Sequence, residues 1–162
     1  MAGFDLGPPF RHGGGMQPIL FVCLGNICRS PAAEAVFRAR ANAAGLDVGA
    51  DSAGTGSWHL GEAPHPDMVA EARRRGYDLT GLRARQVARG DFARFGLILA
   101  MERPVLDRLL RLAPATGARV GMFPDATADA PDVPDPWYTR DFAGTLDIIE
   151  AGVERLIAGL SR

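Results

Sequence analysis

Two thiols, an arginine and a serine stand close together near the start of the chain, in the run Cys23-Leu24-Gly25-Asn26-Ile27-Cys28-Arg29-Ser30-Pro31. A thiol separated from a guanidinium by five intervening residues can attack a phosphoryl group while the planar, two-donor arginine holds its oxygens. The spacing alone is weak evidence, because the 162 residues include 18 basic ones, all arginine, and a buried structural cysteine would give the same pattern.

The elements around this run predict a site for an anion. Residues 19–22 are apolar and are typical of a buried strand, and Ser30 and Pro31 suit the cap and first position of an alanine-rich helix that ends near Gly45. Unpaired backbone N–H groups and the positive end of the helix dipole then converge on the loop between strand and helix. We therefore expect a cradle for a phosphate at this loop.

The whole run, followed by Ala33-Glu34, resembles the phosphate-binding loop of the low-molecular-weight protein tyrosine phosphatases. The resemblance extends over about residues 18–160. It implies that Cys23 is the nucleophile of a phosphocysteine intermediate, that Arg29 clamps the phosphate oxygens, and that Ser30 eases departure of the sulfur. It also implies that the phosphate is cradled by the loop residues Leu24, Gly25, Asn26, Ile27 and Cys28.

A second apolar stretch, residues 48–53, predicts another strand, which ends in the turn Ser52-Ala53-Gly54. The resemblance implies that Ser52 supports Asn26 through hydrogen bonds, although an ordinary turn serine would fit the same position. Trp58 follows in a loop. The resemblance places it on one wall of the substrate cleft, and the alternative is a tryptophan folded back over the core.

The acidic, proline-rich stretch 124–136 ends in Asp135-Pro136-Trp137-Tyr138. A carboxylate next to a proline and two aromatic residues can be held at a fixed height above a cleft. This run resembles the general-acid loop of the family, so that Asp135 matches the proton donor and Trp137 and Tyr138 border the cleft. Asp132 is the alternative carboxylate.

Strand and helix patterns alternate along the chain, with further strands expected at 97–101 and 120–123 and helices at 66–75, 104–112 and 142–160. This alternation predicts an α/β fold, a four-stranded parallel sheet with helices on both faces. The resemblance implies the strand order 2-1-3-4, with the phosphate loop after strand 1. We expect a glycine- and proline-rich extension without fixed structure at 1–17 and one phosphatase domain at 18–162.

Three positions depart from the family pattern. Leu82 stands where many members have a histidine of the loop-supporting network, which would leave the network thinner or closed through water. Glu102 replaces the usual aspartate after the third strand, and Val105 replaces an asparagine. Any supporting role of that turn is therefore in question.

Composition limits the kinds of binding partner and the cellular compartment that the sequence predicts. A net charge of −1 argues against nucleic-acid binding, and the basic cluster at 73–75 fits a solvated helix end. No stretch approaches the ~18 apolar residues of a membrane span or has the pattern of a signal peptide. With only two cysteines, we expect a reduced, cytoplasmic protein, and the sequence does not fix its oligomeric state. His59, Glu62, His65 and Asp67 have no metal-ligand spacing, so we expect no metal or cofactor.

The sequence thus predicts a metal-independent phosphomonoester hydrolase acting on phosphotyrosine in a protein, a tyrosine kinase being one candidate. An arsenate reductase on the same fold would need cysteines outside the loop, and none is present. The resemblance extends to protein-arginine phosphatases, which tend to have threonine in place of Ile27. A silent phosphotyrosine-binding module is disfavoured because nucleophile, clamp and acid are all present. Cys28 is expected either to pack as a small hydrophobe or to close a protective disulfide with oxidised Cys23.

Overall fold

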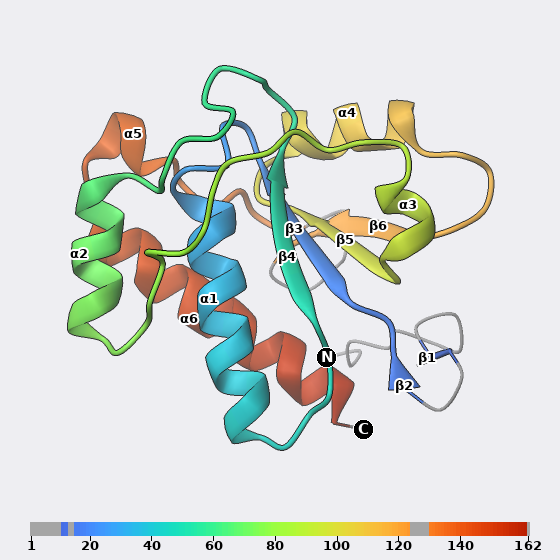
Figure 1. The fold of residues 1–162 in the computed structure, drawn as a ribbon, viewed down its shortest axis with the longest axis horizontal. Helices are drawn as coiled ribbons and strands as arrows, with labels where there is room; N and C mark the ends of the chain where they lie inside the picture. Colours follow the sequence, from blue (N-terminus) through green and yellow to red (C-terminus); the bar gives the residue numbers. More distant parts are fainter. Residues whose placement is uncertain (1–10, 13–14, 124–129, 162) are drawn as a thin grey trace.

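The computed structural model describes residues 11–12, 15–123 and 130–161 and has a four-stranded parallel sheet at its centre (Figure 1). Its strands are β3 (Ile19–Cys23), β4 (Ala50–Gly54), β5 (Leu97–Ala100) and β6 (Arg119–Met122). They lie side by side in the order β4-β3-β5-β6, and each neighbouring pair is parallel. The predicted order 2-1-3-4 is therefore confirmed.

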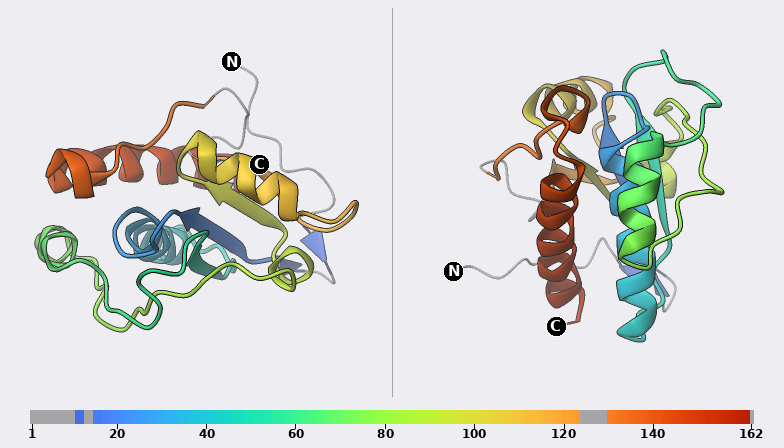
Figure 2. Two further views of the ribbon diagram at one scale, coloured as in Figure 1. Left: turned by 90° about the horizontal axis from the view of Figure 1, so that it is seen from above. Right: turned by 90° about the vertical axis from the view of Figure 1, so that its left-hand side faces the viewer.

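Helices cover both faces of this sheet (Figure 2). On one face α1 (Arg29–Ala43) packs against β3, β4 and α6 (Phe142–Leu160), and α2 (Pro66–Arg74) packs against α6. On the other face α4 (Arg103–Leu112) contacts β5 and β6, and Phe92 of the short α3 (Asp91–Arg94) joins its apolar core. Alternate strand residues supply the two cores, because successive side chains of a strand point to opposite faces.

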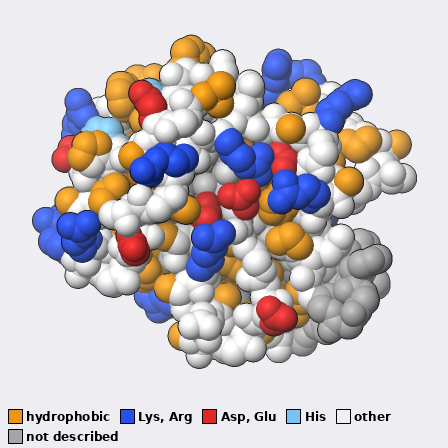
Figure 3. Space-filling view, in the orientation of Figure 1, with side chains coloured by type: hydrophobic (Ala, Val, Ile, Leu, Met, Phe, Trp, Pro, Cys, Tyr) orange, Lys and Arg blue, Asp and Glu red, His pale blue; other side chains and the backbone are white. Residues whose placement is uncertain are grey.

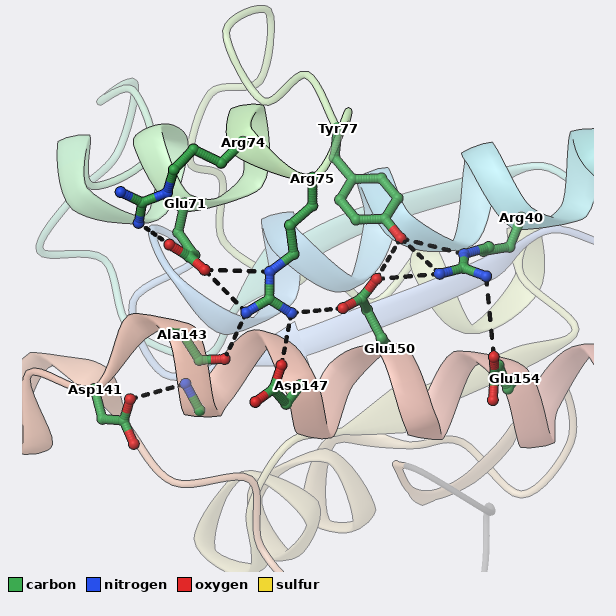
Figure 4. A network of polar contacts seen from close by, with 11 residues as sticks. Arg40, Glu71, Arg74, Arg75, Tyr77, Asp141, Ala143, Asp147, Glu150 and Glu154 are labelled. Atoms are coloured by element: carbon green, nitrogen blue, oxygen red, sulfur yellow. Dashed lines mark hydrogen bonds and ion pairs between the residues drawn. The ribbon is translucent and has the colours of Figure 1, made fainter.

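A network of charged and hydroxyl groups joins the three helices of the first face (Figure 4). Arg75, just after α2, reaches Glu150 of α6 at 2.6 Å, and Glu150 accepts a hydrogen bond from Tyr77 at 2.6 Å. Arg40 of α1 donates to the same tyrosine and to Glu150. These contacts hold the carboxyl-terminal end of α2 against α1 and α6.

Ahead of the sheet, β1 (Arg11–His12) and β2 (Gly15–Met16) form a two-stranded antiparallel pair. This pair lies within the stretch 1–17 that was expected to lack fixed structure. Residues 1–10 and 13–14 lie outside the described residues, and for them that expectation stays a prediction. No helix in the described part of the chain is long and apolar enough to cross a membrane.

Candidate active site

The loop after β3 bends so that its backbone points at the sulfur of Cys23, the last residue of that strand. Asn26 has a left-handed backbone (φ 57°), which asparagine tolerates better than most residues, and its N–H donates to Cys23 Sγ at 3.2 Å. The end of β4 runs so close beneath the loop that a Cβ on Gly54 would lie 2.7 Å from the carbonyl oxygen of Leu24. Glycine is therefore required where β4 meets the loop.

Hydrogen bonds to the side chain of Asn26 fix the direction in which Ser30 donates. The Asn26 Oδ1 accepts the backbone N–H of Arg85 at 3.0 Å, so the amide nitrogen must face the two serines. It donates to Ser30 Oγ at 2.8 Å and to Ser52 Oγ at 3.0 Å. Because Ser30 Oγ accepts this bond, its own proton has two acceptors within reach, Cys23 Sγ at 3.0 Å and Ala53 O at 3.4 Å. When Cys23 is a thiolate its sulfur can only accept, so the backbone N–H of Asn26 and the hydroxyl of Ser30 can both donate to it.

Helix α1 begins at Arg29, one residue before the predicted cap at Ser30. That prediction was wrong because the hydroxyl of Ser30 is used by the sulfur and the loop rather than by the helix end. Cys28 occupies the cap position and makes no side-chain capping bond. The first N–H groups of α1 therefore have no side-chain cap, as an anion-binding helix start requires.

The support of the loop continues from Ser52 to a buried carboxylate. Ser52 Oγ donates to Glu34 Oε1 at 2.7 Å, and the Glu34 side chain is 2% exposed. Burial raises the pKa of Glu34, while the bond from Ser52 and the charge of Arg38 work against that rise. Leu82, which stands in the histidine position, packs against the apolar core. The hydrogen-bond network that runs from Asn26 through Ser52 ends at Glu34, which accepts directly from Ser52 Oγ.

Arg29 is 1% exposed and is surrounded by acceptors. Its Nη1 donates to Val133 O at 3.1 Å and lies 3.1 Å from Glu102 Oε2, and its Nη2 lies 3.3 Å from Asp135 Oδ2. Burial alone would lower the pKa of Arg29, but the charges of Cys23, Glu102 and Asp135 outweigh it and raise that pKa. The sequence left open whether the turn after β5 supports the site. Glu102 of that turn does so, because it pairs with the Arg29 guanidinium and orients it.

Asp135 caps the short helix α5 (Pro136–Thr139), with its Oδ1 accepting the N–H of Trp137 at 3.0 Å. This helix was not predicted from the sequence, although an aspartate followed by a proline is a helix-start signal. The capping bond leaves Oδ2 of Asp135 to face Arg29. Asp132 has a different partner, because its Oδ1 accepts the N–H of Arg103 at the start of α4, 2.8 Å away.

Loop, acid and aromatic residues border one hollow of about 260 Å³, here called the loop hollow. It gathers ten of the predicted residues and one that sequence reasoning missed, His59: its lining is Cys23, Leu24, Gly25, Ile27, Cys28, Arg29, Trp58, His59, Asp135, Trp137 and Tyr138. The predicted residues Asn26, Ser30 and Ser52 lie behind the lining and hold it. His59 follows Trp58 directly, and that adjacency was the available signal.

The aromatic side chains of the loop hollow are open to solvent. Trp58 is 71% exposed and Tyr138 78%, so the alternative of a tryptophan folded over the core is wrong. Gly56 makes room for the indole, since a Cβ there would lie 1.9 Å from Trp58. Trp137 lies between two histidines, with ring centroids 5.9 Å from His59 and 6.0 Å from His65.

Cys23 and Cys28 are both buried, free thiols. Burial and the nearby Cys23 charge raise the pKa of Cys28 to about 12, so at neutral pH it is a protonated thiol. Within the described ranges, no group of three or more His, Cys, Asp or Glu side chains is arranged to hold a metal ion.

Comparisons with known proteins agree on one family. Residues 18–162 match the family model described as low molecular weight phosphotyrosine protein phosphatase. The low molecular weight protein-tyrosine-phosphatase YfkJ of Bacillus subtilis is 41% identical over 152 residues, which cover 91% of this chain and 97% of YfkJ. Its crystal structure matches with a TM-score of 0.82 at 40% identity, covering 93% of this chain and 98% of YfkJ.

Two further relatives extend the comparison. A low molecular weight protein-tyrosine-phosphatase of Streptomyces coelicolor is 45% identical over 152 residues, covering 88% of this chain and 92% of its own. The crystal structure of a Drosophila arginine phosphatase has a TM-score of 0.83 at 27% identity, covering 91% of this chain and 99% of its own. By its family match and its relatives, the chain belongs to the low molecular weight phosphotyrosine protein phosphatase family.

Proposed function

We propose that this protein hydrolyses phosphotyrosine in proteins through a phosphocysteine intermediate. The observation that carries the proposal is the convergence of Cys23, Arg29 and Asp135 on one hollow that aromatic side chains border. Family membership supports the same reaction class. The proposal assigns a role to each of these residues.

In the first step the Cys23 thiolate attacks phosphorus, forming an S–P bond as the bond from phosphorus to the phenolic oxygen breaks. The N–H of Asn26 and the hydroxyl of Ser30 stabilise the thiolate before attack. Arg29 and the loop N–H groups hold the phosphoryl oxygens, where negative charge is concentrated in the transition state. Asp135 gives its proton to the departing phenolate.

In the second step water attacks the phosphocysteine, and its proton passes to Asp135, which now acts as a base. The S–P bond breaks, phosphate leaves, and the electron pair returns to the sulfur of Cys23. Ser30 donates to that sulfur and makes it a better leaving group. Each cycle thus consumes one water and restores both the thiolate and the protonated carboxyl.

The aromatic walls favour an aryl phosphate over an alkyl one. Trp58, Trp137 and Tyr138 line the loop hollow and can pack against a phenyl ring. Protein-arginine phosphatase activity is the alternative, because a Drosophila arginine phosphatase shares the fold. Ile27 lies in the lining and offers an apolar surface to the ligand, which suits a phenyl ring better than a guanidino group.

The proposal also covers the substrate class and the cellular compartment. The substrate is a phosphotyrosine protein, a tyrosine kinase among the candidates, in the cytoplasm. A reducing compartment fits an enzyme whose nucleophile must be a free thiol, and both cysteines are free.

Rates on matched substrates test the function. Peptides of one sequence that carry phosphotyrosine, phosphoserine or phosphoarginine should be compared, with arsenate reduction measured alongside. We expect phosphotyrosine to be turned over with the highest kcat/KM. Faster turnover of phosphoarginine, or arsenate reduction without phosphatase activity, would contradict the proposal.

A further inference from the structure

The loop hollow opens into a second, larger depression that the reaction itself does not use. This depression, here called the α2 groove, has a volume of about 770 Å³, against about 260 Å³ for the loop hollow. Ile27, His59 and Trp137 line both. The other lining residues come from the segment before α2, from α2 itself and from the turn after it: Glu62, Ala63, Pro64, His65, Pro66, Val69, Ala70, Arg73, Thr80 and Arg83.

The α2 groove carries two arginines that form no ion pair with a carboxylate among the described residues. Hydrogen bonds from Thr80 are the main cause that lowers the pKa of Asp78, and the charge of Arg73 adds to it from outside ion-pair distance. Arg83 donates to backbone carbonyls, to Thr80 O at 3.1 Å and Leu82 O at 2.6 Å. Glu62, the acidic residue of the lining, is bonded to His59. The groove therefore offers net positive charge.

The other two arginines of the basic cluster behave differently (Figure 4). Arg74 is paired with Glu71, and Arg75 with Glu71, Asp147 and Glu150. The sequence predicted one solvated face for all three, yet Arg73 alone of them lines the α2 groove. Figure 3 shows basic side chains at the left edge of the molecule, where α2 lies in Figure 1.

We propose that the α2 groove binds the polypeptide beside the phosphotyrosine and selects acidic residues there through Arg73 and Arg83. This rests on the proposed function, since the phosphotyrosine must occupy the loop hollow. A chain leaving that hollow passes His59 and Trp137, which border both spaces, and continues along α2. The groove combines apolar residues, such as Val69 and Pro66, with the two arginines, as an acidic peptide with some apolar side chains requires.

The length of α2 sets the position of the acidic residues. His65 is anchored to the phosphate loop, because its N–H donates to Ile27 O at 2.8 Å. Arg73 lies eight residues further on, roughly 12 Å at 1.5 Å per residue of helix. An extended peptide spans that distance in about four residues at ~3.3 Å each. Acidic residues about three to five positions from the phosphotyrosine should therefore give the strongest preference.

Two matched pairs of substitutions test this proposal. Arg73→Ala and Arg83→Ala remove the groove charges, while Arg74→Ala and Arg89→Ala remove exposed charges that do not line the groove. Each variant should be assayed on para-nitrophenyl phosphate and on phosphotyrosine peptides with Glu or Gln at positions three to five, on either side. Binding of the same peptides should be measured with each substitution placed in a Cys23→Ser background.

We expect the unsubstituted enzyme to prefer the Glu peptides in kcat/KM and in binding. Each groove substitution should weaken that preference roughly two- to fivefold, the range of an exposed ion pair, and added salt should do the same. The two control substitutions should keep it, and para-nitrophenyl phosphate turnover should not change in any of the four.

Equal binding of Glu and Gln peptides would overturn the proposal, as would equal losses in the control variants. Failure of the enzyme to hydrolyse any phosphotyrosine peptide would overturn the catalytic role instead. Because the binding comparison uses the inactive background, the two failures can be told apart.

Discussion

Replacing Ser52 by alanine should loosen the phosphate loop and destabilise the fold together. Ser52 Oγ is the link between Asn26 in the loop and Glu34 in α1, accepting from the one at 3.0 Å and donating to the other at 2.7 Å. The substitution leaves the buried Glu34 carboxylate without this donor and removes one of three side-chain bonds of Asn26.

The magnitudes follow from the charge of each partner. A hydrogen bond to a charged group contributes about 1.5–3 kcal/mol, which in a domain of this size lowers Tm by roughly 3–12 °C. The bond to the Asn26 amide is between neutral groups and contributes about 0.5–1.5 kcal/mol, so kcat should fall roughly two- to tenfold. With the loop less firmly held, iodoacetate, an anion that must enter the same cradle, should alkylate Cys23 more slowly.

Stability should depend on pH in a defined direction. Because the folded-state pKa of Glu34 is raised above its ordinary 4.5, the folded protein binds this proton more tightly than the unfolded chain. Stability from this group is therefore lost as pH rises above 4.5 toward the folded-state pKa. Removing the Ser52 bond raises that pKa further, so the Tm gap between Ser52→Ala and wild type should widen from pH 4.5 upward.

Thermal unfolding at several pH values, the alkylation rate of Cys23 and kcat on para-nitrophenyl phosphate measure these effects. Ser57→Ala, at an exposed serine in the following loop, is the matched control. A Ser52→Ala protein with reduced Tm but unchanged alkylation rate and kcat would refute the positioning role. It would leave Ser52 as an ordinary, buried turn residue.

Other substitutions separate the groups of the loop hollow. Asp135→Ala should slow phosphotyrosine hydrolysis by roughly 10²–10⁴-fold and should slow hydrolysis of an activated aryl ester by less. If Asp132→Ala shows this pattern and Asp135→Ala does not, the general acid is Asp132 and the assignment of Asp135 is wrong. Glu102→Ala should raise the inhibition constant of inorganic phosphate, because the clamp arginine loses an orienting partner; unchanged inhibition would rule that role out. At pH 8 iodoacetamide should label Cys23 far faster than Cys28, whose pKa is about 12, and equal labelling would contradict its buried, protonated state. After peroxide treatment, dithiothreitol should restore activity in wild type much more than in Cys28→Ser, and equal recovery without an intramolecular disulfide by mass spectrometry would leave Cys28 as packing.

The sequence predicted the parts of the site that depend on local order. Cys23 and Arg29 belong to one contiguous run, and Asp135 to a short run with its own proline, so spacing and resemblance were enough to find them. The alternation of strands and helices was likewise sufficient for the sheet, whose order the structure confirms.

Contacts between distant segments could not be predicted in the same way. The bond from Ser52 to Glu34 needs β4 to lie beside α1, and the pairing of Glu102 with Arg29 needs the end of β5 to lie beside the loop. For Glu102 the sequence offered only a general indication: an arginine in the phosphate loop would need acidic partners if it were buried, but the sequence does not say which residues supply them. The division of the basic cluster, with Arg73 in a groove and Arg74 in an ion pair, depends on where α2 packs.

Trapping the covalent intermediate tests the central claim most directly. Wild-type enzyme should be quenched with acid during turnover of a phosphotyrosine peptide, and its tryptic peptides should be examined by mass spectrometry. We expect phosphate on Cys23 alone, and we expect Cys23→Ser to bind phosphate or vanadate while losing nearly all turnover. Phosphate on another residue, or substantial turnover by a clean Cys23→Ser preparation, would contradict the mechanism.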